Sequence, residues 1–147
     1  MNGFEASAVL LGLVVVATAA GLLWRARTGR VHRKHSGEVV AAAEVGAEAF
    51  GAGATLLQFS TEFCAPCRAT ARVLGQVGAE RPGIEHIEVD LTDRPDLARR
   101  FGILQTPTTL VLDAEGTIRA RIGGAPRPAD VRSIIDDLLG SSHVRTV

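Results

Sequence analysis

The chain of 147 residues contains only two cysteines, Cys64 and Cys67, and two residues separate them. An apolar run at residues 55–60 (TLLQFS) precedes the pair and predicts a buried strand. Helical spacing over residues 65–80 predicts a helix directly after it. The residues of that helix expected to face the sheet are Ala69, Val73 and Val77. The pair thus lies at a helix N-terminus, and two cysteines exclude a disulfide-stapled small protein and a four-cysteine zinc site.

A cysteine at a helix N-terminus is more reactive than an ordinary thiol. Unpaired backbone N–H groups and the helix dipole stabilise negative charge at that end. Such surroundings lower a thiol pKa from about 8.5 to between about 3.5 and 7.5. We therefore expect Cys64 to be the attacking thiolate and Cys67, one turn further in, to resolve the mixed disulfide. Pro66 lies in the first helical turn, where its missing N–H costs little.

The rest of the chain alternates between strand and helix periods. After the first strand and helix, the predicted elements are strand, helix, strand, strand and helix, at residues 84–91, 95–101, 108–113, 117–122 and 128–139. The first strand–helix–strand unit makes a parallel pair, and the late hairpin adds antiparallel strands. The predicted fold class is α/β, a four-stranded mixed sheet flanked by helices. The domain is expected to span residues 39–140, with a short amphipathic helix at 39–50 and a loose tail at 141–147.

Four segments together resemble the thioredoxin family. They are FSTEFCAPCR after the first strand, VDLTDRPDLARRFGI at the end of the second, Thr106-Pro107-Thr108 at the start of the third and Gly123-Gly124 after the fourth. A CxxC pair followed about 40 residues later by Thr-Pro, in this order of elements, is a specific pattern. The resemblance covers residues 39–140 and implies the thioredoxin fold.

The resemblance also implies roles for residues around the cysteines. Pro107 is expected to be a cis proline that faces the cysteines and belongs with them to the catalytic set. The backbone of Thr106 is expected to pair with a bound peptide. The other residues expected to contact the substrate are Phe63, Ala65 and Pro66.

Two positions beneath the pair depart from the family pattern. Thioredoxins carry a buried aspartate six residues before the first cysteine, and this chain has Gln58 there. A lysine on the neighbouring strand commonly faces that aspartate, and the aligned residue here is Glu88. Strand alternation turns Glu88 toward Gln58, so we expect Glu88 to accept the proton that Cys67 loses. His86, on the same face of that strand, is expected to pack or to face solvent.

A second feature lies apart from this domain. Residues 6–24 form a run of 19 residues without a charge, which spans about 28 Å as a helix. We predict a transmembrane helix with Trp24 at the membrane interface. A cleaved signal peptide is the main alternative, because Ala17-Thr18-Ala19 fits a cleavage site. The residues before the run lack the positive charge of a signal peptide, and a buried core helix is the third possibility.

The charges on either side of the run predict its orientation. Residues 25–34 contain five Arg or Lys and no acid, whereas the tail of residues 1–5 carries only Glu5. Basic residues are retained on the cytoplasmic side of a membrane. The predicted location is therefore the plasma membrane, single-pass, with the soluble domain in the cytoplasm. Residues 25–38 are interpreted as a basic linker.

Composition limits the partners. From residue 36 onward, 11 basic and 15 acidic residues give a net charge of −4, which does not favour nucleic-acid binding. The four histidines lack the spacing to complete a zinc site with the cysteine pair. We expect no metal and no cofactor, and a monomer that exchanges electrons with protein dithiols and disulfides.

Three functions are open from the sequence. The first is a membrane-tethered thiol–disulfide oxidoreductase that reduces protein disulfides and is recharged by an upstream electron donor. The second is an exported, anchored reductase resembling those that serve cytochrome c maturation. The third is a non-catalytic adaptor that binds partners through the same fold, which the retention of both Cys64 and Cys67 disfavours.

Overall fold

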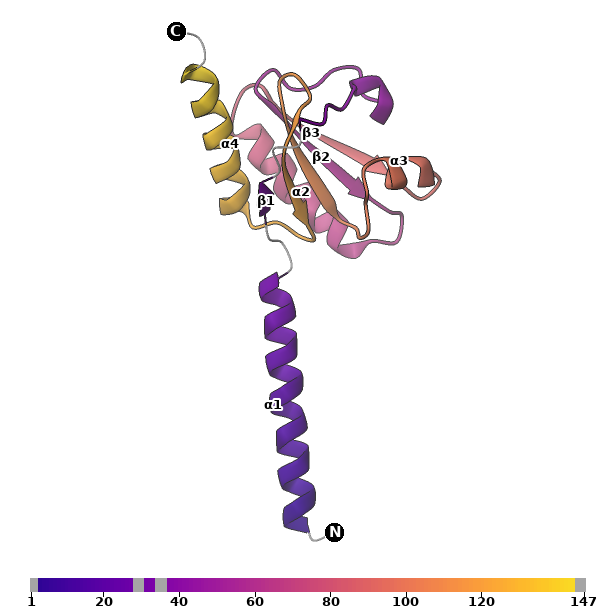
Figure 1. Ribbon diagram of the computed structural model, residues 1–147, viewed down its shortest axis with the longest axis vertical. Coiled ribbons are helices and arrows are strands. Elements are labelled where there is room, and N and C mark those ends of the chain that lie inside the picture. The colour runs from indigo at the N-terminus through magenta and orange to yellow at the C-terminus, as the bar shows by residue number, and fades with distance from the viewer. Residues whose placement is uncertain (1–2, 28–30, 34–36, 145–147) are drawn as a thin grey trace.

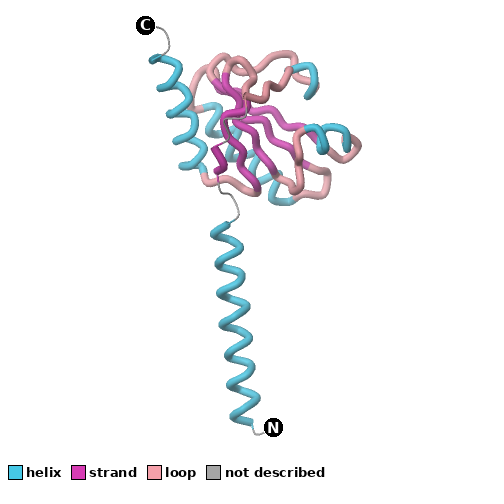
Figure 2. Tube along the Cα trace, in the orientation of Figure 1, coloured by secondary structure: helices cyan, strands magenta, loops and turns pink. Residues whose placement is uncertain are grey.

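The structure is a computed structural model that describes residues 3–27, 31–33 and 37–144, with side chains described for residues 5, 7–23 and 37–140. An N-terminal helix, α1 (Gly3–Arg27), projects away from a sheet domain that carries the cysteine pair (Figure 1). Figure 2 shows helices on both sides of the central strands of that domain.

The described residues form a five-stranded sheet in the order β1-β5-β4-β2-β3. Strands β2 and β3 are parallel because a helix connects them as a crossover, and all other neighbouring strands are antiparallel. The predicted mixed sheet is confirmed, with one additional edge strand. The strands are β1 (Val31–Arg33), β2 (Ala54–Ser60), β3 (Ile84–Asp90), β4 (Thr108–Asp113) and β5 (Ile118–Gly123).

An apolar core lies on each face of the sheet. On one face, Leu56 of β2 lies in a core with Leu74 of α2 and Val131 of α4. On the other face, Phe59 of β2 lies in a core with Leu97 of α3. All seven residues of β2 are buried, as expected for a central strand covered on both sides. The helices are α2 (Ala65–Ala79), α3 (Pro95–Arg100), α4 (Pro128–Val144) and the short 3-10 helix η1 (Ala42–Val45).

The buried side of α2 differs from the predicted one. Val77 is buried as expected, but Ala69 is exposed and Val73 is only partly buried. The predicted buried side is rotated about the helix axis relative to the observed one, because the prediction does not count Cys67 and Thr70 as core residues. The described residues of α2 that are buried are Cys67, Thr70, Leu74, Val77 and Gly78.

The predicted basic linker contains β1, which the sequence analysis does not predict. Val31 lies opposite Ile122 of β5 in an antiparallel ladder. Without β1, β5 would be an edge strand with unpaired N–H and C=O groups, and β1 satisfies part of them. Residues 28–30 and 34–36 of the linker lie outside the described residues.

Two further predictions are wrong, one on the segment before β2 and one on the C-terminal tail. Residues 39–50 form only the single turn η1 instead of an amphipathic helix, and Gly46 ends it with a φ of 74°. The region closest to the C-terminus is helical rather than loose as far as Val144, because α4 continues past the predicted end. Residues 145–147 of the predicted tail lie outside the described residues.

The N-terminal run is a helix in the structure, as α1 covers residues 6–24 completely. Within the described part of the chain, no helix has both the length and the apolar character that crossing a membrane requires. The predicted helix is therefore confirmed and the predicted membrane span is not. The side chains of Trp24 and of the basic residues that follow it lie outside the described residues.

Candidate active site

The cysteine pair occupies the N-terminus of α2. Cys64 is the residue that precedes the helix, and a disulfide joins it to Cys67 with their Cα atoms 5.2 Å apart. The backbone N–H of Cys67 donates to the Cys64 sulfur at 3.2 Å and to the Cys64 carbonyl oxygen at 3.1 Å. An N–H directed at this sulfur stabilises a thiolate once the disulfide is reduced. The geometry therefore favours Cys64 as the nucleophile.

The outer side of the pair is open to solvent. Cys64 is 8% exposed and Cys67 only 2%, so Cys64 is the more accessible residue of the pair. The neighbours Ala65 and Pro66 are exposed, and Phe63 is 93% exposed. A large aromatic side chain in this position offers apolar surface to an approaching protein.

The loop before β4 lies against the cysteine loop. The hydroxyl oxygens of Thr61 and Thr106 are 3.3 Å apart, although 45 residues separate them in the sequence. The peptide bond between Thr106 and Pro107 is cis, as the resemblance implies, and Pro107 is buried. Its carbonyl oxygen accepts the backbone N–H of Gly124 at 2.8 Å. The contact between the two threonines brings Thr106 and Pro107 beside the disulfide loop.

The same loop contributes a residue that the sequence analysis does not single out. Leu104 lies three residues before Pro107 and is 98% exposed. A leucine between Ile103 and Gln105 gives no periodic signal in the sequence, so only the fold shows that its side chain points to solvent on the loop that neighbours the cysteines. Leu104 and Phe63 are the two most exposed large apolar residues of the described domain.

A buried amide lies on the inner side of the pair. Gln58 is fully buried, and its Nε2 donates to the carbonyl oxygen of Cys67 at 3.0 Å and, more weakly, to Oε1 of Glu88 at 3.4 Å. The Oε1 of Gln58 lies 3.1 Å from Nε2 of His86. The prediction that Glu88 faces Gln58 is confirmed by this contact and by their pairing in the sheet. Its proposed role in proton transfer stays a prediction, because Glu88 is exposed and contacts the amide of Gln58.

His86 takes part in this arrangement, although the sequence analysis expects only packing or solvent contact. Its ring is half-buried, and burial lowers its pKa below the ordinary value of 6.5, against the smaller opposing effect of the Glu88 carboxylate. Burial therefore favours the neutral imidazole. Strand alternation places residues 84, 86 and 88 of β3 on the face of the sheet toward which Gln58 points, but it does not give the hydrogen bond between His86 and Gln58.

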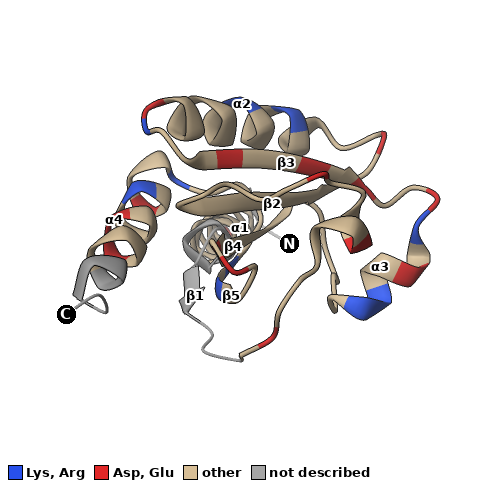
Figure 3. Cartoon of the chain, turned by 90° about the horizontal axis from the view of Figure 1, so that it is seen from above, with Lys and Arg blue, Asp and Glu red and all other residues tan. Residues whose placement is uncertain are grey.

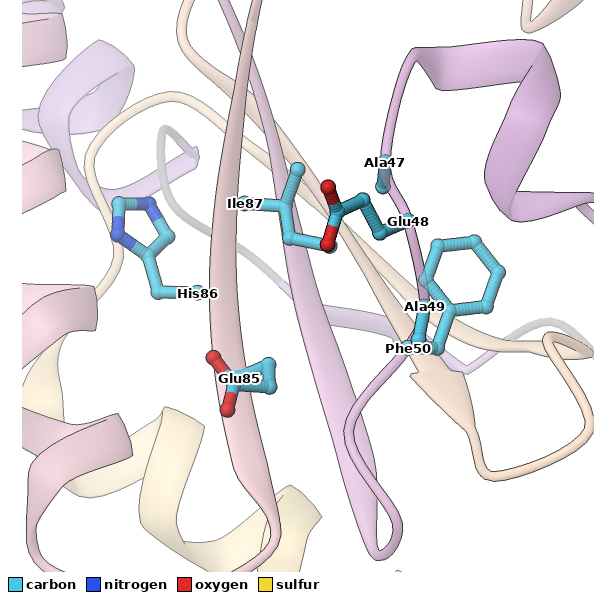
Figure 4. A pocket seen from close by; sticks show the side chains of 7 residues that line it. All are labelled: Ala47, Glu48, Ala49, Phe50, Glu85, His86 and Ile87. Atoms are coloured by element: carbon cyan, nitrogen blue, oxygen red, sulfur yellow. The ribbon is translucent and has the colours of Figure 1, made fainter.

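No group of three or more metal-ligating side chains occurs among the described residues. An open pocket between residues 47–50 and β3 is lined by Phe50, Glu85 and Ile87, among others (Figure 4). Strand β3 at the edge of the sheet carries the acidic residues Glu85, Glu88 and Asp90, and acidic positions are visible along it in Figure 3. None of the residues lining the pocket comes from the cysteine loop or from the loop around Pro107, so it is separate from the disulfide.

Comparison with known proteins identifies the family. The sequence model of the thioredoxin family matches residues 43–137, which is more than half of the chain. The chain belongs to the thioredoxin family. The matched region begins within η1 and ends within α4, so it contains the disulfide and the loop around Pro107.

Individual relatives agree with this assignment. The chain is 31% identical over 88 residues to a chloroplastic M-type thioredoxin of Zea mays, covering 59% of this chain and 52% of that protein. It is 28% identical over 88 residues to a putative thioredoxin 2 of Streptomyces coelicolor, covering 60% and 62%. The chain therefore spans about half to three fifths of the length of these curated relatives.

Solved structures share the fold. Thioredoxin-2 of the malaria parasite superimposes with a TM-score of 0.55 at 20% identity, over 72% of this chain and 98% of that one. A thioredoxin of Nicotiana alata superimposes with a TM-score of 0.52 at 23% identity, over 58% and 73%. At these identities the likeness establishes the fold alone.

Proposed function

We propose that this protein is a thiol–disulfide oxidoreductase that acts on protein disulfides. The observation that carries the proposal is the Cys64–Cys67 disulfide at the N-terminus of α2, beside the loop that contains Pro107. In this arrangement, Cys64 supplies an activated sulfur and Cys67 supplies a second sulfur within reach. The loop around Pro107 supplies backbone groups beside the pair. We further propose that the protein needs no bound cofactor and acts as a monomer, since one chain supplies all of these groups.

The proposed reaction consists of two exchanges. The Cys64 thiolate attacks one sulfur of a partner disulfide, forming a mixed disulfide and releasing one partner thiolate. Cys67 then loses its proton and attacks Cys64, which restores the internal disulfide and releases the second partner thiolate. The partner gains two electrons, and an upstream dithiol returns the protein to its reduced form. We propose Glu88 as the acceptor of the Cys67 proton, supported by its contact with Gln58.

Protein substrates are supported by the surface around the disulfide. Phe63 and Leu104 expose apolar side chains on the two loops that the Thr61–Thr106 contact brings together. An exposed apolar pair next to a reactive sulfur is suited to an unfolded or loosely folded polypeptide. The backbone of Thr106 would pair with an extended segment of that polypeptide.

Reduction of insulin by the full-length chain tests the proposed activity. With dithiothreitol as the electron source, the wild type should accelerate precipitation of the insulin B chain, and Cys64→Ser should fall to the uncatalysed rate. A wild type that binds insulin without accelerating its reduction would instead support the non-catalytic adaptor.

We also propose that α1 anchors the chain in a membrane with the domain on the cytoplasmic side. Residues 6–24 carry no charge, and the large apolar side chains described in α1 are 56–70% exposed. A helix with apolar residues on every side is unfavourable in water. The five basic residues at positions 25–34 support the orientation. The exposed residues are Val9, Leu10, Leu11, Leu13, Val14, Val15, Val16, Leu22 and Leu23.

Extraction of cell membranes with alkaline carbonate tests the anchor. The wild type should stay in the pellet, and a variant with Leu11→Arg and Val15→Arg should move to the supernatant, because an arginine at the centre of a membrane helix costs about 2.5–3.5 kcal/mol. Recovery of the wild type in the supernatant contradicts the anchor. Labelling of a C-terminal tag on intact cells by an impermeant reagent would contradict the orientation and support the exported reductase.

A further inference from the structure

The hydrogen bonds around Gln58 determine which way its amide points. The carbonyl oxygen of Cys67 and the carboxylate of Glu88 can only accept, so the Gln58 nitrogen must face both of them. The opposite orientation would place the oxygen of the fully buried Gln58 against two acceptor oxygens. The Gln58 oxygen is therefore directed at His86, 3.1 Å from Nε2.

This orientation fixes the proton on His86. An amide oxygen accepts, so Nε2 of His86 must carry the hydrogen that it donates to Gln58. Figure 4 shows His86 and Ile87 on opposite sides of β3. Its other ring nitrogen faces α2, where a side-chain carbon built on Gly75 would lie 4.0 Å from Nδ1. The ring thus lies between α2 and the sheet as the neutral Nε2–H tautomer.

The contacts form a continuous series that ends at the Cys64 sulfur. His86 donates to Gln58, and Gln58 donates to the carbonyl oxygen of Cys67. The backbone N–H of Cys67 donates to the sulfur of Cys64. The middle contact connects β2 to the first turn of α2, where the main chain of Cys67 sets the direction of the final N–H.

We propose that His86 is a positioning residue for the nucleophile: through Gln58 it holds the main chain of Cys67 so that its N–H meets the Cys64 sulfur. The inference rests on the proposed function, because it concerns the reactivity of the same sulfur. His86 touches neither cysteine sulfur in this role. Without that N–H, the buried Gln58 oxygen loses its donor, and the amide that holds the main chain of Cys67 keeps only its two contacts through Nε2.

Alkylation of Cys64 measures the proposed effect directly. In the reduced full-length chain carrying Cys67→Ser, which keeps the backbone N–H and carbonyl, Cys64 is the only thiol. The rate of iodoacetamide reaction as a function of pH gives the thiolate pKa. Addition of His86→Leu should raise this pKa by about half a unit to one unit, the equivalent of one neutral hydrogen bond. At a pH below the pKa, the rate should fall about three- to tenfold.

Two matched variants distinguish the donor from the bulk of the side chain. His86→Gln restores an N–H that can reach the Gln58 oxygen, and it should return the pKa to within a few tenths of the reference value. Glu85→Gln changes an exposed residue that strand alternation places on the opposite face of β3, and it should leave the pKa unchanged. An unchanged pKa in a folded His86→Leu variant overturns the proposal, as does an equal shift in the leucine and glutamine variants.

Nitrogen NMR of the wild type covers the case in which the leucine variant does not fold. The proposal requires the Nε2–H tautomer of His86 at neutral pH, and an Nδ1–H tautomer overturns it. The insulin assay is read separately from both measurements. If the wild type does not reduce insulin but His86→Leu still raises the Cys64 pKa, only the proposed function is contradicted. If the wild type reduces insulin but His86→Leu leaves the Cys64 pKa unchanged, only the role of His86 is contradicted.

Discussion

The outer and inner sides of the cysteine pair differ in exposure and in polarity. The outer side presents Phe63 and Leu104, which are apolar and more than 90% exposed. The inner side presents Gln58, a polar residue that is fully buried and hydrogen-bonded to the main chain of Cys67. This is the reverse of the usual distribution of apolar and polar side chains. The proposals assign a different task to each side: the outer side binds partners, and the inner side sets the chemistry of the sulfurs.

Removal of the inner sulfur should have the largest effect. In Cys67→Ser, the Cys64 thiolate can still attack a partner, but nothing within the chain resolves the mixed disulfide. Turnover should fall to background while covalent complexes accumulate on non-reducing gels. The control Cys64→Ser should give neither turnover nor complexes, and complexes formed by Cys64→Ser would reverse the assignment of the two cysteines.

Substitution of Glu88 tests proton transfer on the inner side. Glu88→Gln keeps an oxygen that accepts from Gln58 but cannot take up a proton near pH 7. Resolution of the mixed disulfide should slow by about 10²-fold, with the first attack by Cys64 little changed. Rapid-quench measurement of the two steps separates them. Equal rates in the variant and the wild type would assign the proton to water.

Substitution of Leu104 tests the outer side. Leu104→Ser should raise KM for a protein disulfide about tenfold, because the apolar contact with the partner is lost. Reduction of a small disulfide such as hydroxyethyl disulfide should be unchanged. Leu104→Met keeps the apolar surface and should behave as the wild type. An equal loss with both substrates would mean that Leu104 supports the active site rather than the partner.

Substitution of Gln58 should affect stability more than any change on the outer side. Gln58→Leu removes the acceptor of the His86 N–H and the buried donor to the carbonyl oxygen of Cys67, which should cost about 1–3 kcal/mol in the free energy of unfolding. Urea denaturation measures the change. The same substitution at the exposed Gln76 of α2 is the control and should stay within about 0.5 kcal/mol of the wild type.

The pH dependence of stability gives the smallest effect and the most selective test of the inner side. Burial lowers the pKa of His86 in the folded state, so the unfolded chain binds a proton more readily. The stability that depends on neutral His86 is present above about pH 6.5 and is lost as the pH falls through the folded-state pKa. Between pH 7.5 and 5, His86→Gln should lose less stability than the wild type. Parallel pH curves for the two proteins would exclude this contribution.

The sequence predicts the cysteine motif better than the side-chain contacts around it. The positions of Cys64, Cys67 and Pro107 follow from a local motif and the order of elements, so they could be recognised without coordinates. The contact between Gln58 and Glu88 follows from strand alternation and register. The involvement of His86 could not be predicted in the same way, because it depends on which acceptors surround the Gln58 amide in the folded chain.

Other differences between the predicted and the observed structure also have local causes. Strand β1 has only three residues and lies among basic residues, so its alternation is too short to predict a strand; pairing with β5 stabilises it. The exposure of Leu104 depends on the course of a loop rather than on any period in the sequence. The phase of α2 is missed because Thr70 is a polar residue in the core.

The position of β1 limits how far the disulfide can act from an anchored α1. Helix α1 ends at Arg27 and β1 begins at Val31. Their Cα atoms are four residues apart along the chain, so they can be separated by no more than about 14 Å. Because β1 pairs with β5, the short connection also limits how far the sheet can move from the end of α1. With α1 anchored as we propose, the domain would search for partners along the membrane surface, in two dimensions rather than three. Partners would then be selected by where they reside as much as by what they present to the sulfurs.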